Sequence, residues 1–373
     1  TVENIVFTGS TGNALWIYHH NPTIRNCVFT GNVTSSLGGA LWSSDTEAII
    51  ENCRFVNNTA SNTGSIFFSK ATKSVGPGPT IRGCVFENNT AYSTAVIQHC
   101  NPVIEQCTFE SNTSPDFFGA TVRVLQSAAT FSDCVFSGNA GSGIGAEYAD
   151  GLQIIDCTFS DNAVAYGGGV RVSGSSSGGV HSALISGCRF TNHVSSVSVF
   201  GSAPNSNNIN LTSFACEFMG IRGALWGASG ASHVIDQCLF KNNFDGTCAS
   251  FRSDVNVSMS QCTFIDNSSS GVSIGGFSTA SFSECLFQNN HATWGPGGIS
   301  VTQTNTIINS CEFKGNGPTS GSGAGAIYHY PGTLEITDSL FCENSGDAGD
   351  IDGPWDDGGA NEFNVECPSD CPD

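Results

Sequence analysis

The chain has 373 residues, only 12% of them charged, and its 32 acidic residues outweigh 12 basic ones to give a formal net charge of −20 at pH 7. This acidity excludes nucleic acid as a partner, because phosphate contacts need clustered Lys and Arg, and it disfavours anionic membranes and polyanionic glycans. The 45 Gly residues and the scarcity of long helix formers favour stacked strands with tight turns over helices.

No apolar run approaches the roughly 20 residues of a membrane span, so we expect no membrane insertion. The chain begins at Thr1 without Met or a signal peptide. We therefore interpret it as a mature product or an excised fragment.

One hexad, Cys-x-Phe-x-x-Asn, returns about every 26 residues along the chain. The first complete copy is CVFTGN from Cys27 and the last is CEFKGN from Cys311, with degenerate copies from Ile5 and Ser339. Phe fills its position in all fourteen copies, Cys in twelve and Asn in eleven. A fixed period of this length indicates stacked units in a solenoid.

The spacing within the hexad predicts two buried ladders. Cys and Phe stand two apart, so both point to the same side of a strand. Asn follows where the strand must turn, and it tolerates left-handed backbone conformations there. The predicted Phe ladder is Phe29, Phe55, Phe86, Phe109, Phe136, Phe159, Phe190, Phe218, Phe240, Phe264, Phe287 and Phe313. The predicted Asn ladder is Asn32, Asn58, Asn89, Asn112, Asn139, Asn162, Asn243, Asn267, Asn290 and Asn316, interrupted by His193 and Ile221.

Two further strands follow each hexad. A Gly- or Ala-rich stretch, such as GGALWS from Gly38, opens a second strand, and a third strand such as LQIIDC leads back to the next hexad. Three short strands and three turns per coil describe a parallel β-helix. We predict an all-β, single right-handed parallel β-helix of about 14 coils over residues 1–345, with a capping tail over 346–373.

The pairing of FxxN with GGA[ILV] resembles the repeat of the chlamydial polymorphic outer-membrane proteins, and related right-handed β-helix domains of secreted bacterial proteins share it. The resemblance runs from Ile5 to Asn344. It implies the fold and an adhesive or surface role, and we expect no autotransporter barrel within these residues.

The tail resembles the ends of predicted secreted β-helix proteins. Trp355 and Phe363 are expected to fold over the last coil and shield Phe341. The edge of the first coil is expected to be bare, which would require a missing upstream segment or another copy stacked head to tail.

Cysteine usage separates into a ladder and a remainder. Twelve of the 17 Cys occupy the hexad position, and parallel side chains hold their Cβ atoms too far apart for an unstrained bond. We interpret them as buried thiols that act as small apolar fillers. The predicted disulfide joins Cys342 to Cys367 or Cys371. No compact CxxC pair exists, so zinc is not expected.

One outward column suggests a ligand. It follows the start of the second strand and would place aromatic rings in a line for sugar stacking, with Arg to bond hydroxyls or carboxylates. The alternative is that these side chains pack under loops or against a partner protein. The residues are Trp16, Trp42, Phe67, Arg123, Arg171, Trp226, Arg252 and Tyr328.

Three long coils carry surplus residues between the second and third strands, in 69–80, 173–182 and 201–210. Insertions on one edge of a solenoid often mark its binding face, and the alternative is tolerated polar loops. Lys70, Lys73 and His99 around the first insertion are the best catalytic candidates, and Asp350, Asp352, Asp356 and Asp357 the best group for Ca²⁺.

The acidic residues are scattered singly, with no signature that recurs in one register, and the Asp group lacks the spacing of a known Ca²⁺ loop. We therefore assign no catalytic residue, metal or cofactor. We predict a non-enzymatic, extracellular or surface-displayed structural or adhesive protein. Its expected partner is another copy, end to end or side by side, or a surface glycan. The alternative is a carbohydrate-active enzyme or a glycan-binding module.

Overall fold

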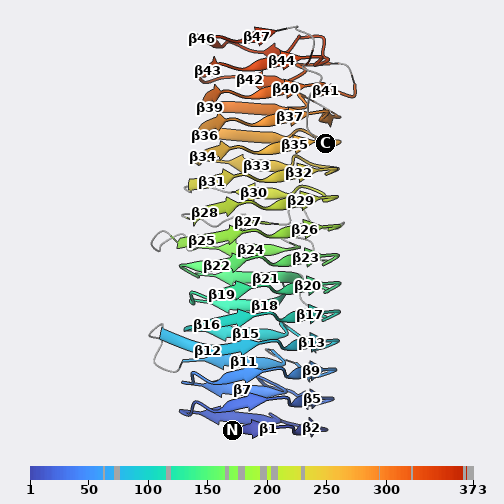
Figure 1. Ribbon diagram of the computed structural model, residues 1–373, viewed down its shortest axis with the longest axis vertical. Coiled ribbons are helices and arrows are strands. Elements are labelled where there is room, and N and C mark those ends of the chain that lie inside the picture. The colour runs from blue at the N-terminus through green and yellow to red at the C-terminus, as the bar shows by residue number, and fades with distance from the viewer. Residues whose placement is uncertain are drawn as a thin grey trace. The chain divides into compact units, whose positions relative to one another are not determined.

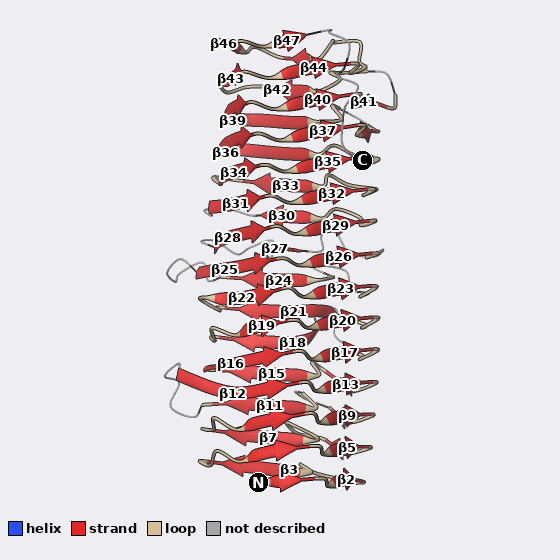
Figure 2. Ribbon diagram, viewed as in Figure 1, coloured by secondary structure: helices blue, strands red, loops and turns tan. Residues whose placement is uncertain are grey.

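The computed structural model describes residues 1–61, 64–70, 76–114, 119–163, 168–174, 181–193, 200–202, 209–227, 232–293, 295–320, 322–363 and 367. The chain divides into two compact units, Thr1–Ala203 and Pro204–Asp373. All regular elements of the described residues are strands, and Figure 2 shows no helix.

The first unit stacks coils of three strands each, and every pairing between coils is parallel (Figure 1). Its hexad strands are β2 (Val6–Thr8), β5 (Val28–Thr30), β9 (Arg54–Val56), β13 (Val85–Glu87), β17 (Thr108–Glu110), β20 (Val135–Ser137), β23 (Thr158–Ser160) and β26 (Arg189–Thr191). Its second strands are β3 (Leu15–Tyr18), β7 (Leu41–Ser44), β11 (Ile66–Ser69), β15 (Ala95–Gln98), β18 (Ala120–Leu125), β21 (Ser142–Glu147), β24 (Val170–Ser173) and β27 (Phe200–Ser202). Its third strands are β1 (Val2–Glu3), β4 (Thr23–Arg25), β8 (Ile49–Glu51), β12 (Gly76–Arg82), β16 (Cys100–Glu105), β19 (Thr130–Ser132), β22 (Leu152–Ile155) and β25 (His181–Ser186). A short extra ladder follows the Asn position in β6 (Val33–Thr34), β10 (Thr59–Ala60) and β14 (Thr90–Ala91).

The second unit repeats the same coil. Its hexad strands are β29 (Glu217–Met219), β32 (Leu239–Lys241), β35 (Thr263–Ile265), β37 (Leu286–Gln288), β40 (Glu312–Lys314), β44 (Leu340–Cys342) and β47 (Glu362–Phe363). Its second strands are β30 (Leu225–Gly227), β33 (Ala249–Arg252), β42 (Ile327–His329) and β45 (Ile351–Asp352), and its third strands are β28 (Ile209–Phe214), β31 (Ser232–Asp236), β34 (Asn256–Ser260), β43 (Leu334–Thr337) and β46 (Asp356–Gly359). Two long strands, β36 (Val272–Ser283) and β39 (Ile299–Asn309), span the second and third positions, while β38 (His291–Ala292) and β41 (Gly317–Pro318) form the extra ladder.

The predicted all-β parallel β-solenoid is confirmed, although the number of coils differs slightly from fourteen. The expected boundary at residue 345 does not end the strand pairing. Strands β45, β46 and β47 pair in parallel with the preceding coil, and Phe363 pairs with Phe341. The tail therefore adds strands to the solenoid in addition to covering its last Phe.

Phenylalanine rings form a continuous stack through each unit. In the first unit the centroids of successive rings from Phe7 to Phe190 lie 4.5–4.9 Å apart, with planes within 7° of parallel. The stack from Phe218 to Phe363 in the second unit has the same spacing, with planes within 9°. The separation matches the roughly 4.8 Å between hydrogen-bonded strands, so the backbone ladder sets the ring spacing.

Small residues at the start of the second strand make room for these rings. A Cβ at Gly143 would stand 2.7 Å from Cδ1 of Phe159, and one at Gly298 would stand 3.0 Å from Cδ1 of Phe313. At these two positions a side chain would crowd the ring, which accounts for the glycine there.

Left-handed residues turn the corners of the coil. One occupies the fifth hexad position, as at Asn57 and Asn88, and another precedes the Cys, as at Asp133 and Asp156. The ladder Asn was expected to take this conformation, and that expectation is wrong. The left-handed turn falls one residue earlier, because the ladder side chain must point inward to reach the neighbouring coils.

The Asn side chains bond from coil to coil inside the turn. Asn139 is fully buried. Its Nδ2 donates to the carbonyl of Phe109 and to Oδ1 of Asn162, both at 2.9 Å. Its Oδ1 accepts from the backbone N and the Nδ2 of Asn112, both at 3.0 Å. Each amide thus satisfies main-chain groups that the turn leaves without strand partners.

Two substitutions interrupt this ladder on either side of the division between the units. His193 is fully buried and its Nδ1 lies 3.2 Å from the carbonyl oxygen of Asn162. Ile221 has no side-chain amide, but its backbone N donates to Oδ1 of Asn243 at 3.0 Å. Ile221 thus keeps the backbone donation of a ladder Asn, whereas the ring of His193 reaches a carbonyl that a ladder Asn does not bond.

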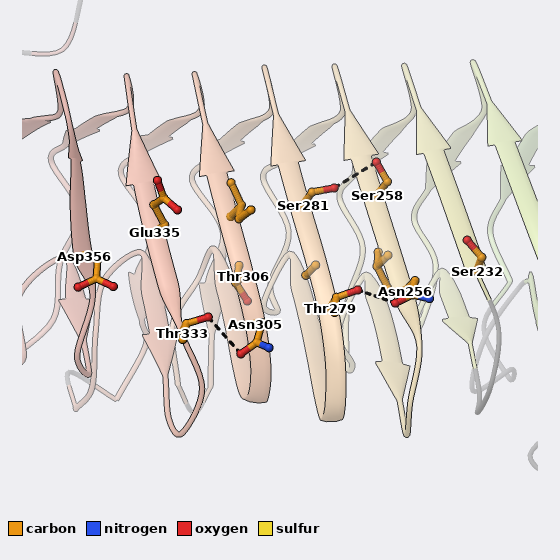
Figure 3. A pocket seen from close by; sticks show the side chains of 13 residues that line it. Ser232, Asn256, Ser258, Thr279, Ser281, Asn305, Thr306, Thr333, Glu335 and Asp356 are labelled. Atoms are coloured by element: carbon orange, nitrogen blue, oxygen red, sulfur yellow. Dashed lines mark hydrogen bonds between the residues drawn. The ribbon is translucent and has the colours of Figure 1, made fainter.

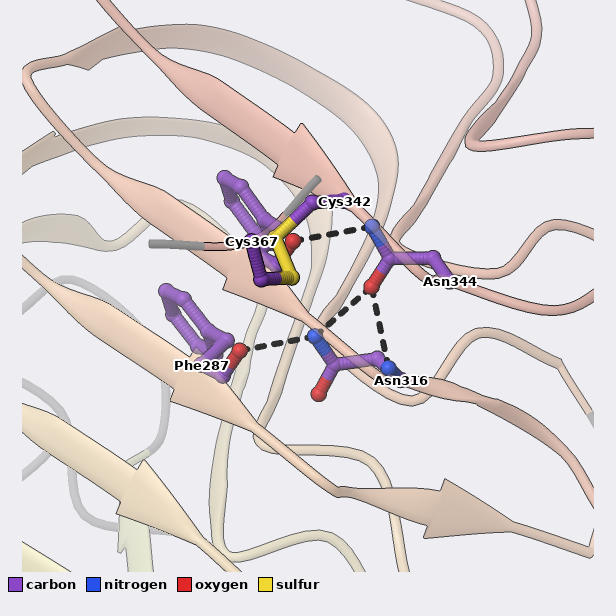
Figure 4. The surroundings of a disulfide bond; sticks show 6 residues. Phe287, Asn316, Cys342, Asn344 and Cys367 are labelled. Carbon is purple, nitrogen blue, oxygen red and sulfur yellow. Dashed lines mark hydrogen bonds between the residues drawn. A yellow bond between two sulfur atoms is a disulfide. The ribbon is translucent and has the colours of Figure 1, made fainter. Parts of the chain in front are cut away.

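Cysteines fall into the two groups that the sequence suggested. The fourteen free cysteines of the described chain are all buried, and the hexad thiols lie near backbone carbonyls, as Cys53 does to Glu51 at 3.3 Å. Cys342 and Cys367 form a disulfide, and Figure 4 shows it beside Asn316 and Asn344 at the end of the Asn ladder. Cys371 lies outside the described residues.

Removal of one ladder amide should destabilise the second unit. Asn290→Ala deletes an Nδ2 that donates to Phe264 and Asn316 and an Oδ1 that accepts from Asn267. Because each buried polar group left unpaired costs about 1–3 kcal/mol, we expect a loss of about 3 kcal/mol or more in denaturant unfolding. Asn309→Ala, at an exposed position, is the matched control. Equal stability of the two variants would contradict the role of the ladder.

Thiol labelling tests the redox state of the Cys column. Burial raises the pKa of Cys100 and of Cys248, each to about 12, and a buried neutral thiol is unreactive. We expect iodoacetamide to leave the fourteen described thiols unlabelled in the native protein and to label all of them after denaturation without reductant, as read by mass spectrometry. Cys342 and Cys367 should be labelled only after reduction. Disulfides within the column would lower the count in denaturant.

Candidate functional site

The predicted aromatic column begins as a short run on adjacent coils. Trp16 pairs in register with Trp42, and Trp42 with Phe67. The rings of Trp16 and Trp42 meet edge to face at 5.2 Å, whereas Trp42 and Phe67 stack at 6.4 Å. Trp16 is 67% exposed but Phe67 is only 7% exposed. The run therefore offers one open ring and no extended platform, since Phe67 is covered and Val96 follows it.

The arginines of the column are held by a carboxylate. Arg123 donates through Nε and through an Nη to the two oxygens of Glu147, both at 3.0 Å. Arg171 approaches the same carboxylate at 3.9 Å, and the Arg123 guanidinium lies 5.9 Å from the centre of the Tyr92 ring. This arrangement neutralises charge on the outer wall between coils and leaves little of Arg123 for a ligand.

In the second unit one residue of the predicted column, Arg252, is out of register. Tyr328 is half-buried and aligns through Ser300, Ser273 and Ser250 with the backbone of Trp226. Arg252 stands two residues beyond Ser250 on β33, so placing it in this column was wrong. Strand β33 begins at Ala249 and has no GGA motif before it. The motif therefore gives no reference point for the register of Arg252. The side chain of Trp226 lies outside the described residues.

The predicted insertions and catalytic candidates give no assembled site. Residues 71–75, 175–180 and 203–208, which belong to the three insertions, lie outside the described residues, as does Lys73. His99 is 7% exposed. Within the described ranges, no group of three or more His, Cys, Asp or Glu gathers to hold a metal ion. No helix of those ranges is long and apolar enough to cross a membrane.

A groove of about 630 Å³ lies on the outer wall of the second unit, where the third strands of six coils lie side by side (Figure 3). Hydroxyl and amide side chains dominate its lining. The lining residues are Ser232, Asn256, Val257, Ser258, Thr279, Ala280, Ser281, Asn305, Thr306, Ile307, Thr333, Glu335 and Asp356.

Strand register orders these side chains into two outward columns. One column runs Ser232, Asn256, Thr279, Asn305 along β31, β34, β36 and β39. The other runs Ser258, Ser281, Ile307, Glu335, Asp356 and continues through β43 to β46. The columns stand two residues apart on each strand, so both face outward.

Neighbouring coils share hydrogen bonds along the first column. Thr279 Oγ1 donates to Oδ1 of Asn256 at 2.6 Å, and Thr333 Oγ1 donates to Oδ1 of Asn305 at 3.1 Å. Both amides are thereby oriented with Nδ2 directed away from that bond. In the second column, Ser281 Oγ donates to Ser258 Oγ at 3.2 Å. These bonds fix a regular polar surface that is still exposed.

A second recess of about 300 Å³ adjoins the groove and shares Thr279 and Asn305 with it. Its distinctive residue is Phe277, which is 77% exposed and holds a left-handed φ of 56° at the corner of β36. Gln303, Pro331 and Gly332 complete its far side. An exposed aromatic ring therefore stands beside the polar columns.

The groove is acidic at one end. Glu335 and Asp356 are register partners on adjacent coils, both at exposed positions, and Figure 3 places them away from Ser232. No Lys, Arg or His is among the thirteen lining residues. The site thus offers neutral hydrogen-bonding groups along its length and negative charge at its end.

Sequence reasoning missed this groove, because its residues are common outward Ser, Thr and Asn. Two signals existed. Phe277 follows Gly275 and Gly276, which puts a large ring at a turn, and the stretch from Thr302 to Thr306 is uniformly polar.

A family model for the right handed beta helix region matches residues 1–119, 62–214 and 205–363. The chain belongs to the right-handed β-helix family. No curated protein matches it significantly in sequence.

Three solved structures are similar to this β-helix at low identity. The receptor-binding protein of bacteriophage Det7, a podoviral tailspike in a myovirus, has a TM-score of 0.44 at 10% identity, over 99% of this chain and 74% of that one. Tailspike protein 3 of bacteriophage CBA120 has a TM-score of 0.32 at 10% identity, over 98% and 53%. The A-module of the Azotobacter vinelandii mannuronan C-5 epimerase AlgE4 has a TM-score of 0.29 at 11% identity, over 89% and 90%.

A buried histidine beneath the groove wall should make this β-helix sensitive to acid. Burial lowers the pKa of His233 to about 4, and neither ring nitrogen has a hydrogen-bond partner in the described structure. The unfolded chain takes up this proton near pH 6.5. Above pH 6.5 the histidine is neutral in both states and does not reduce the free energy of unfolding. Below that pH the free energy of unfolding falls, by up to about 3 kcal/mol as the pH drops toward 4.

Denaturant unfolding at pH 7 and pH 4.5 measures this loss. His233→Leu should lose less stability between the two pH values than the natural chain does. His291→Leu, at an exposed position, should behave like the natural chain. The same pH dependence in both variants would show that His233 is not responsible.

Proposed function

We propose that this chain is a non-enzymatic, extracellular or surface-displayed β-solenoid that serves as an adhesive scaffold, with the groove of the second unit as a binding face. The observation that carries the proposal is the lining of that groove, which is long, shallow and polar. Such a surface suits contact with an extended ligand better than enclosure of a small substrate. The resemblance of the repeat to polymorphic outer-membrane proteins supports a surface role.

The outer wall of the first unit favours a scaffold as well. Its arginines pair with carboxylates of neighbouring coils, including Arg25 with Glu3 at 2.8 Å, Arg54 with Glu87 at 3.1 Å and Arg82 with Glu105 at 3.0 Å. Exposed pairs of this kind add little stability. They do neutralise the few cations of a chain with net charge −20, which keeps its surface soluble and selective against anionic partners.

Self-association, end to end or side by side, is the second part of the proposal. Parallel sheets leave unpaired strand edges that can receive another chain. The described edge strand β46 carries exposed Asp356 and Asp357, and like charges there oppose stacking of identical edges. Tail-to-tail contact is therefore disfavoured, which leaves head-to-tail stacking and lateral contact as the two proposed modes.

The alternative function is a carbohydrate-active enzyme, and one observation favours it. Glu335 and Asp356 are adjacent in register, and strands lie about 4.8 Å apart, close to the carboxylate separation of retaining glycosidases. Both residues are exposed, however, whereas the general acid of such enzymes sits in a shielded, apolar environment. The exposure of both carboxylates therefore favours binding without turnover.

Adhesion and turnover can be measured on the same preparation, after sedimentation has established whether it is monomeric or filamentous. We expect labelled protein to bind at least one cell surface or glycan-coated bead, and to release neither reducing ends nor unsaturated products from a polysaccharide panel. An unrelated acidic protein of similar charge is the control. Turnover that disappears in the double variant Glu335→Gln/Asp356→Asn would establish the enzyme instead, and absence of adhesion would refute the scaffold.

A further inference from the structure

We propose that the groove and the Phe277 recess together bind an extended oligosaccharide of neutral pyranose rings, with a preference for amino sugars at the Glu335–Asp356 end. This inference rests on the adhesive function proposed above and names the chemistry of its ligand. It is carried by the spacing of the polar columns, the exposed ring beside them and the charge of the lining.

The spacing of the groove suits a glycan. Its polar columns repeat once per coil, about every 4.8 Å, and that rise is close to the length of one pyranose unit in an extended chain. Asn256 and Asn305 occupy the same column two coils apart, or about 9.6 Å. Successive sugars lying across the strands would therefore meet equivalent side chains.

The polar side chains are already oriented for such a ligand. Oδ1 of Asn256 and Oδ1 of Asn305 each accept a threonine hydroxyl, which leaves each Nδ2 to donate outward. The hydroxyls of Ser258 and Ser281 bond to each other and retain acceptor capacity. These hydrogen bonds hold the donors and acceptors of the outer wall in place before a ligand arrives. Binding the hydroxyl groups of a sugar would therefore cost little side-chain conformational entropy.

Phe277 supplies the apolar contact that sugar recognition needs. Its ring is 77% exposed and projects from a left-handed corner beside the recess formed with Pro331 and Gly332. Burying such a ring against the C–H face of a pyranose removes apolar area from water. The adjoining Thr279 and Asn305 would then bond the hydroxyls at the ring edge.

Charge selects among glycans. Glu335 and Asp356 are the two ionisable residues of the groove lining, and no cation balances them there. Uronates and sulfated sugars would be repelled, whereas the ammonium group of a de-acetylated amino sugar would be attracted. The preferred ligand is therefore neutral or amino-bearing.

Titration calorimetry with defined hexamers tests this assignment on the full chain. The probes are malto- and cello-hexaose, chitin and chitosan hexamers, and oligomers of alginate and polygalacturonate. We expect binding to at least one neutral or amino-bearing hexamer and none to the uronate oligomers. Phe277→Asn should weaken binding roughly tenfold, or about 1.4 kcal/mol, and Asn tolerates the left-handed corner.

Tyr148→Asn is the matched control, because Tyr148 is an exposed aromatic residue with a φ of 53° in the first unit and lines neither recess. It should bind as the natural chain does. The double variant Asn256→Ala/Asn305→Ala should also lose affinity, and Glu335→Gln/Asp356→Asn should lose only the preference for chitosan over chitin. Circular dichroism confirms the fold of each variant.

Several outcomes would overturn the assignment. They are preference for uronates, absence of binding to every hexamer, or equal binding by Phe277→Asn and Tyr148→Asn. Self-association abolished by Phe277→Asn without any glycan binding would show that the ring contacts a second copy. If the natural chain adheres to surfaces but the groove variants adhere equally well, the ligand assignment fails while the adhesive function stands. Absence of adhesion by the natural chain would refute both.

Discussion

The spacing between hydrogen-bonded strands is the constraint on which the rest of this structure depends. Each coil rises by about 4.8 Å, so every buried side chain lies directly against its counterparts in the coils before and after. Phenylalanine accepts this arrangement because flat rings stack in parallel at that separation, as Phe109 and Phe136 do at 4.7 Å. Asparagine accepts it because an amide carries both donors and acceptors. The hexad repeats because few residue types pack against copies of themselves.

The same constraint explains where repetition fails. A ladder amide needs a partner in the next coil, so His193 and Ile221 each leave part of the ladder open. The division between the two units falls between these positions. Outside the wall no such pairing rule applies, because solvent satisfies any polar group there. The interior is therefore uniform in sequence, while the outer positions are free to differ from coil to coil.

This difference sets what could be predicted from the sequence. The fold followed from Phe and Cys at alternate positions and from the period. The location of the left-handed turn did not, because an Asn favours both an inward ladder and a positive φ, and the Asn57–Asn58 pair uses one residue for each. The outer column was harder still. Phe67 is buried and Arg252 is out of register. The exposure and the register of an outward residue both depend on how the neighbouring coils align, and the sequence of a single coil does not specify that alignment.

The candidate binding face illustrates why function sits on that outer wall. In the first unit the outward Arg123 is committed to Glu147, so the charge is used within the protein. In the second unit the outward positions of β34, β36 and β39 in the groove hold small polar groups, with the exception of Ile307. These groups bond sideways between neighbouring coils, and the bonds align the remaining donors in rows. A regular backbone thus converts ordinary Ser, Thr and Asn into a periodic surface. A ligand that shares the period can use every coil, whereas a globular partner would meet the same groups at only a few points.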